Sequence, residues 1–136
     1  MVVRRMPRVQ EIILPILRNG LPGVDVGSWV PDVLDRQFPL INIRRLGGLP
    51  LDIDFLDKPV LEITAYHNTN LIDTENLLLD ARQVLWDAKK NQTIVPGKGY
   101  IHSYFETLGP TQFDSPFDDT WRMQLLVQLG IRPTRI

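Results

Sequence analysis

The longest regular pattern in the sequence is the stretch NLIDTENLLLDARQVLWDAKK, from Asn70 to Lys90. Its apolar residues recur every three or four positions, the spacing that places side chains on one face of an α-helix. These residues are Leu77, Ala81, Val84, Leu85 and Ala88. Asn70 and Asp73 are both suitable N-caps, and the closing lysines suit the negative end of the helix dipole. We therefore predict an amphipathic helix that starts at Asn70 or Asp73 and ends near Lys90.

Alternating patterns on both sides of this helix predict β-strands. The clearest runs from Trp121 to Leu129, where every second residue is apolar and only Leu126 breaks the alternation. Further predicted strands cover Phe38 to Arg45, Val60 to His67 and Tyr100 to Thr107, with an extended segment from Val24 to Val33 that Pro31 closes.

A shorter helix is predicted near the start of the chain. Pro7 suits the first helical position, and Gly20 followed by Pro22 is a stop signal. The apolar face between them consists of Val9, Ile12, Ile13, Ile16 and Leu17. Pro15 interrupts this pattern, because a proline inside a helix removes a hydrogen bond. We expect either a kink at Pro15 or a helix that ends early.

The order of these elements is helix, two or three strands, helix, two strands. We therefore predict an α+β fold, a mostly antiparallel sheet of four to five strands with two helices packed on one face. The 136 residues fit a single domain, residues 1–136.

Composition narrows the possible functions. The formal net charge of -1 argues against a nucleic-acid-binding protein, whose domains are usually basic. The absence of cysteine excludes thiol catalysis, thiolate metal sites and disulfides. No apolar run approaches a membrane span, and Met1 to Arg5 is not followed by a signal-peptide stretch. We expect a soluble protein that neither enters a membrane nor carries an export signal.

The residues that could carry chemistry do not form a known site. Asp52 to Asp57 lacks the central glycine and terminal glutamate of a calcium loop, so we interpret it as a solvated acidic loop. His67 and His102 are isolated in predicted strands, and Ser103 faces away from His102. No phosphate-binding glycine motif occurs. We expect no enzyme activity, no metal and no cofactor.

The features that remain indicate protein contacts. A long loop from Leu46 to Pro59 and a second one from Gly109 to Asp119 are both predicted. The candidate interface residues are Arg44, Arg45, Leu51, Ile53, Phe55, Leu56, Trp86, Phe113 and Phe117. The apolar residues of the first loop either bind a partner or fold back on the core, and Trp86 is either an interface or a core anchor.

Several segments resemble the tail terminator proteins of long-tailed actinobacteriophages, particularly those that infect mycobacteria. They are PRVQEIILPILR from Pro7, FPLINIRRLGG from Phe38, LEITAY from Leu61, the helix from Thr74 with its following NQT, YFETLGPTQF from Tyr104 and DTWR from Asp119. The stretch Leu49 to Asp54 departs from the common pattern.

The resemblance implies a specific assembly. Terminators of this kind have the fold of lambda-like tail terminators and form a hexameric ring on the head-proximal end of the tail tube. Such a ring binds the major tail tube protein, stops tube growth and offers a docking surface to the head–tail connector. The protein would be part of the virion, assembled in the host cytoplasm.

DNA would only pass through the lumen of this ring, so a basic lining is not expected. The acidic residues concentrate between Asp52 and Asp87. We therefore expect part of the Asp52 to Asp57 loop, or the acidic face of the long helix, to point toward the channel. Two alternatives stay open: a neck or head-completion protein of the same phages, and a small ligand-binding domain.

Overall fold

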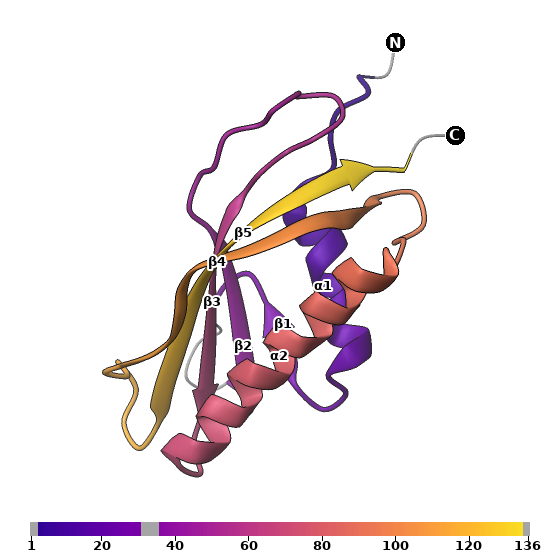
Figure 1. Ribbon diagram of the computed structural model, residues 1–136. Coiled ribbons are helices and arrows are strands. Elements are labelled where there is room, and N and C mark those ends of the chain that lie inside the picture. The colour runs from indigo at the N-terminus through magenta and orange to yellow at the C-terminus, as the bar shows by residue number, and fades with distance from the viewer. Residues whose placement is uncertain (1–2, 31–35, 135–136) are drawn as a thin grey trace.

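The computed structural model describes residues 3–30 and 36–134. Within them the chain forms α1 (Val9–Gly20), β1 (Asp25–Gly27), β2 (Leu40–Arg45), β3 (Val60–His67), α2 (Leu71–Asn91), β4 (Gly99–Phe113) and β5 (Trp121–Pro133) (Figure 1). The described strands form one sheet in the order β1-β2-β3-β5-β4. Its β1–β2 pair is parallel and every other neighbouring pair is antiparallel, so the predicted α+β class is confirmed.

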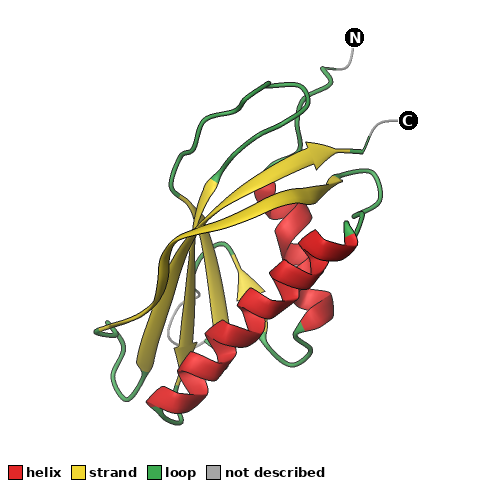
Figure 2. Cartoon of the chain, viewed as in Figure 1, coloured by secondary structure: helices red, strands yellow, loops and turns green. Residues whose placement is uncertain are grey.

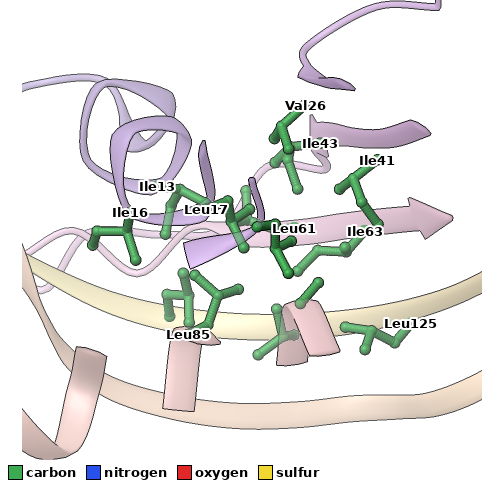
Figure 3. Close-up of a cluster of buried hydrophobic side chains, with 14 of the residues drawn as sticks. Ile13, Ile16, Leu17, Val26, Ile41, Ile43, Leu61, Ile63, Leu85 and Leu125 are labelled. Atoms are coloured by element: carbon green, nitrogen blue, oxygen red, sulfur yellow. The ribbon is translucent and has the colours of Figure 1, made fainter. Parts of the chain in front are cut away.

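Both helices cover the same face of the sheet (Figure 2). Alternate residues of each strand point toward them, and the helices contribute the apolar stripes that the periodicity predicted. The resulting core contains side chains from α1, α2 and every strand of the described sheet, and Figure 3 shows part of it. Its labelled members are Ile13, Ile16, Leu17, Val26, Ile41, Ile43, Leu61, Ile63, Leu85 and Leu125, all of them buried.

The helix boundaries follow from local chemistry. The Asn70 side chain caps α2 by accepting a 2.7 Å hydrogen bond from the Asp73 N–H, so Asn70 is the cap rather than Asp73. In α1 the first helical residue is Val9, two residues later than predicted from Pro7. The expectation of an early end at Pro15 is wrong, because the helix continues to Gly20.

Packing explains why α1 continues past Pro15. A proline costs roughly 3 kcal/mol inside a helix. The residues that follow it, Ile16 and Leu17, are buried, and each buried aliphatic side chain stabilises by about 1.5–3 kcal/mol. Pro15 itself is exposed. Burial of the helix end therefore outweighs the lost hydrogen bond.

Boundaries of the other elements also differ from the sequence prediction, and β2 begins at Leu40 rather than at Phe38. The loop predicted from Gly109 is wrong, since β4 continues to Phe113 and β5 to Pro133. The pairing of β4 with β5 is irregular between Glu106 and Thr111, and this irregularity accommodates Gly109 and Pro110. In addition, β4 lies at the edge of the sheet, where a proline is tolerated. The extended segment from Val24 narrows to β1, while Pro31 and Val33 lie outside the described residues.

Candidate protein–protein interface

The loop between β2 and β3 is closed at its base by main-chain hydrogen bonds. The Leu46 N–H donates to the Val60 carbonyl at 2.7 Å, and the Val60 N–H donates to the Gly47 carbonyl at 3.3 Å. Gly48 adopts a φ of 90°, and a Cβ there would lie 2.2 Å from the Lys58 carbonyl oxygen. The two arms of the loop are thus in direct backbone contact, which only glycine permits at this position.

The prediction of a solvated acidic loop is wrong at Asp57. It is buried, and its carboxylate accepts two hydrogen bonds from the Arg45 guanidinium, at 2.8 and 3.1 Å. Its main chain also pairs with Ile131 of β5, with N–H to O distances of 3.1 and 2.9 Å. A bidentate arginine–carboxylate pair is strong and directional. Arg45, a predicted interface residue, therefore anchors the base of the loop.

Beyond this base the loop carries an apolar tip, which we define as residues 49–55. The exposed fractions of its large side chains are high: Leu49 81%, Leu51 70%, Ile53 75% and Phe55 53%. Leu56 is half-buried, and its carbonyl accepts hydrogen bonds from the Leu51 and Asp52 N–H groups, which turns the chain back. In Figure 1 the loop projects beyond the sheet.

The tip does not fold back on the core, which was one of the two sequence-based alternatives. Soluble monomers rarely expose contiguous apolar surface of this kind unless it binds something. The exposed side chains of Leu51, Ile53 and Phe55 therefore fit the other alternative, a surface that another protein covers.

A second candidate surface lies where α2 meets the edge strand β4. We call it the shelf: Arg82, Gln83, Trp86, Tyr104, Phe105 and Glu106, which line a hollow of about 440 Å³. The ring centroids of Trp86 and Tyr104 are 5.5 Å apart and nearly perpendicular. Phe105 is 67% exposed and Trp86 39% exposed, so the hollow has aromatic walls that face solvent.

Polar contacts hold the shelf in place. The Arg82 guanidinium donates to Glu106, and the Tyr104 hydroxyl donates to the same carboxylate at 3.2 Å. Burial raises the pKa of Tyr104, and the negative charge of nearby Glu106 raises it further. The Tyr104 hydroxyl therefore stays protonated and can donate a hydrogen bond at neutral pH. The hydrogen bond with Glu106 raises the pKa of Arg82. Lys89 places its ammonium 4.9 Å from the centre of the Trp86 ring.

The remaining predicted interface residues lie on the open face of the sheet or beside it. Phe117 packs on Tyr66 with ring centroids 5.3 Å apart and is half-buried, so it mainly holds its own loop. Phe113 is 36% exposed and lies under the Arg122 guanidinium, 5.1 Å away. Arg44 is exposed and pairs with Glu62 across the strands at 3.0 Å.

Sequence reasoning missed Leu49, Phe105 and Leu108, all of which are exposed. The error at Phe105 has a physical origin. Simple alternation places Phe105 on the same side as the buried Ile101. A register shift between Ile101 and Ser103 reverses the alternation, so Tyr104 faces the helices and Phe105 faces solvent.

In residues 3–30 and 36–134, no three His, Asp or Glu side chains lie close enough together to hold a metal ion. His67 accepts a 2.9 Å hydrogen bond from the Asn68 N–H through Nδ1, and His102 is exposed on β4. Neither helix in the same part of the chain combines the length and apolar character needed to cross a membrane.

Comparison with known proteins decides the family. The model of the phage tail termination protein family matches residues 5–136. The chain belongs to this family. It is 50% identical over 135 residues to the Gene 22 protein of Mycobacterium phage L5, and 48% identical over 134 residues to that of Mycobacterium phage D29. Each alignment covers 96% of both proteins.

Family membership makes this chain a structural protein of a bacteriophage tail and hence of the virion. The predicted resemblance to terminators of mycobacteriophages is therefore confirmed. Among solved structures, a chain of the virion of a native gene transfer agent particle is similar, with a TM-score of 0.49 and 12% identity. That alignment covers 91% of this chain and 94% of the other.

Proposed function

We propose that the protein forms a hexameric ring on the head-proximal end of the phage tail tube and stops tube polymerisation there. The ring binds the major tail tube protein on one side and offers a docking surface to the head–tail connector on the other. The observation that carries this proposal is the match of residues 5–136 to the tail termination family. Assembly takes place in the host cytoplasm, and the function requires no catalysis and no cofactor.

The surface chemistry supports a role in assembly. The tip and the shelf expose aromatic and aliphatic side chains at two separate places. Such exposure does not stabilise an isolated domain, and it is typical of surfaces that bind another protein. A ring needs two different surfaces on each subunit, because its contacts are head-to-tail and close by rotation. The predicted interface residues Leu51, Ile53, Phe55 and Trp86 supply parts of both surfaces.

The acidic side of α2 is suited to the channel. Asp73, Asp80 and Asp87 recur every seven residues, so they lie along one line of the helix, and the first two are exposed. A lumen lined by carboxylates does not bind phosphate, whereas a basic lining would hold the duplex through counterion release. We place this acidic line toward the channel, where it lets DNA pass.

A tube-capping assay tests the proposal. Purified major tail tube protein of the same phage is allowed to polymerise with and without this chain, and tube lengths are measured by electron microscopy. We expect short tubes with a ring at one end. Light scattering should give about 94 kDa for six copies of 15.6 kDa, in solution or on release from tubes.

A tip variant and a matched control sharpen the assay. Ile53→Ser with Phe55→Ser should leave the domain folded and give overlong tubes. Ile72→Ser removes a similarly exposed isoleucine, 71% against 75% for Ile53, but lies on α2 far from the tip, and should cap normally. Unlimited tube growth with the unaltered protein, together with a strictly monomeric mass, contradicts the proposal.

A further inference from the structure

The tip and the shelf have complementary properties within one chain. We infer that the tip of one copy inserts into the hollow of the shelf on a second copy, and that this contact joins neighbouring subunits. The inference rests on the proposed ring and names the surfaces that build it. Three observations carry it: apolar complementarity, charge and the separation of the two surfaces within one copy.

Apolar complementarity is the first observation. Ile53 of the tip is 75% exposed, and Leu51, two residues before it, is 70% exposed. The hollow of about 440 Å³ has the size of a small binding pocket, so it has room for side chains of this kind. Its walls include Trp86 and Tyr104, and aromatic residues of this type are common anchors at the centres of protein interfaces.

Charge is the second observation. Asp52 and Asp54 lie on either side of Ile53, and both are exposed. The shelf holds the ion pair of Arg82 with Glu106, and Lys89 beside it places its ammonium over the Trp86 ring. These three groups have a net charge of +1, and the two carboxylates beside Ile53 have a net charge of -2, so the charges of the two surfaces are opposite in sign. Such an arrangement fixes the orientation of two partners and disfavours tip-to-tip contact between like charges.

The separation of the surfaces is the third observation. The tip lies beyond the end of the sheet, whereas the shelf lies on the flank formed by α2 and β4 (Figure 1). Arg45 and Asp57 clamp the base of the loop against β5, which restrains the loop from swinging toward its own shelf. A contact between two different surfaces is heterologous, so every subunit keeps one tip and one shelf to share. Such a series forms a ring when the rotation between neighbouring copies closes, as the proposed function requires.

Site-directed cross-linking tests the contact, because the chain contains no cysteine. Two single variants are prepared, Ile53→Cys on the tip and Gln83→Cys on the shelf, and a short bis-maleimide reagent is added. We expect cross-linked dimers when the two variants are mixed and far fewer with either alone. The double variant should give a ladder that ends at six copies. The reaction is run on the free protein and on protein bound to tail tubes.

The matched control replaces Gln83→Cys by Ile72→Cys, another exposed position on the same helix but outside the shelf. This pair should not cross-link above the level of either variant alone. Equal yields with Ile72→Cys, or efficient cross-linking of Ile53→Cys by itself, overturn the inference. A ring that caps tubes without the mixed cross-link also overturns it, while leaving the proposed function intact. If the unaltered protein neither forms a ring nor caps tubes, the proposed function is contradicted as well.

Discussion

The helix-covered face of the sheet and the tip of the β2–β3 loop are built from the same kinds of residue, with opposite results. Leucine and isoleucine side chains on the covered face, such as Leu125 and Ile63, are fully buried. Those on the tip, such as Leu51 and Ile53, are at least 70% exposed. Apolar residues on the covered face stabilise the fold, whereas Leu51 and Ile53 on the tip remain in contact with solvent in the single chain. This difference separates the residues that hold the protein together from those that we propose to bind another protein.

The largest expected effect compares one leucine from each region. Leu125→Ala should lower the free energy of unfolding by about 3 kcal/mol, since it removes a fully buried side chain and leaves a cavity. Leu51→Ala should change it by less than about 0.5 kcal/mol, as is usual for exposed positions. Urea denaturation of both variants measures the two values. Equal losses would mean that the tip belongs to the core.

A smaller effect is expected at the base of the loop, where two neighbouring glycines differ. Both have positive φ, 82° for Gly47 and 90° for Gly48, so alanine is strained at either. Only at Gly48 would the new Cβ also meet the backbone of Lys58 and Pro59, while nothing lies near it at Gly47. We expect Gly48→Ala to destabilise by about 2 kcal/mol and Gly47→Ala by about 1 kcal/mol.

Thermal unfolding followed by circular dichroism measures this pair. The Gly48→Ala protein should also lose capping activity, since its loop arms are pushed apart and the tip is displaced. If Gly47→Ala is the more damaging variant, direct contact between the loop arms does not control the loop.

The smallest expected effect concerns a charge cluster away from both regions. Glu11 lies 3.0 Å from the charged nitrogens of both Arg8 and Lys98 and 3.7 Å from Arg5. The hydrogen bond from Lys98 lowers the pKa of Glu11, with a further contribution from Arg8. A carboxyl whose pKa is lower in the folded state stabilises the fold above its ordinary pKa, and this stabilisation disappears as the pH falls through the folded-state value.

Glu11→Gln should therefore cost less than about 1 kcal/mol at neutral pH, in line with other exposed ion pairs. The difference from the unaltered protein should shrink toward zero as the pH falls below the ordinary pKa of glutamate. Glu75→Gln, on the exposed side of α2, is the control. Urea melts at several pH values give the profile, and a difference that grows toward acid pH would contradict the assignment.

Much of the fold could be predicted from periodicity alone. The predicted strand from Val60 to His67 matches β3, and the apolar stripe around Leu85 identified α2. Periodicity works there because each element buries one continuous face. It failed at the ends of β4 and β5, where pairing between two long strands extends the sheet past Gly109 and Pro110. Pairing of this kind depends on a partner strand, which a local window does not contain.

The candidate interface could be predicted only in part. Leu51, Ile53 and Phe55 stood out because they interrupt an acidic loop, and Trp86 because it flanks the stripe of α2. The hollow beside Trp86 could not be predicted, because it is formed by α2 and β4 together. Tyr104 faces this hollow because a register shift reverses the strand alternation, and no residue type marks that shift.

The sequence by itself determined the α+β class, the amphipathic helices, the alternating strands and the resemblance to tail terminators. These properties can be predicted from the order of the residues, because helical and strand periodicities are local. Tertiary structure alone decided that Asp57 is buried against Arg45, that the tip stays exposed and that Trp86 and Phe105 share one hollow. Each of these depends on which distant segments meet, and burial and pairing across the sheet settle that only when the whole chain has folded.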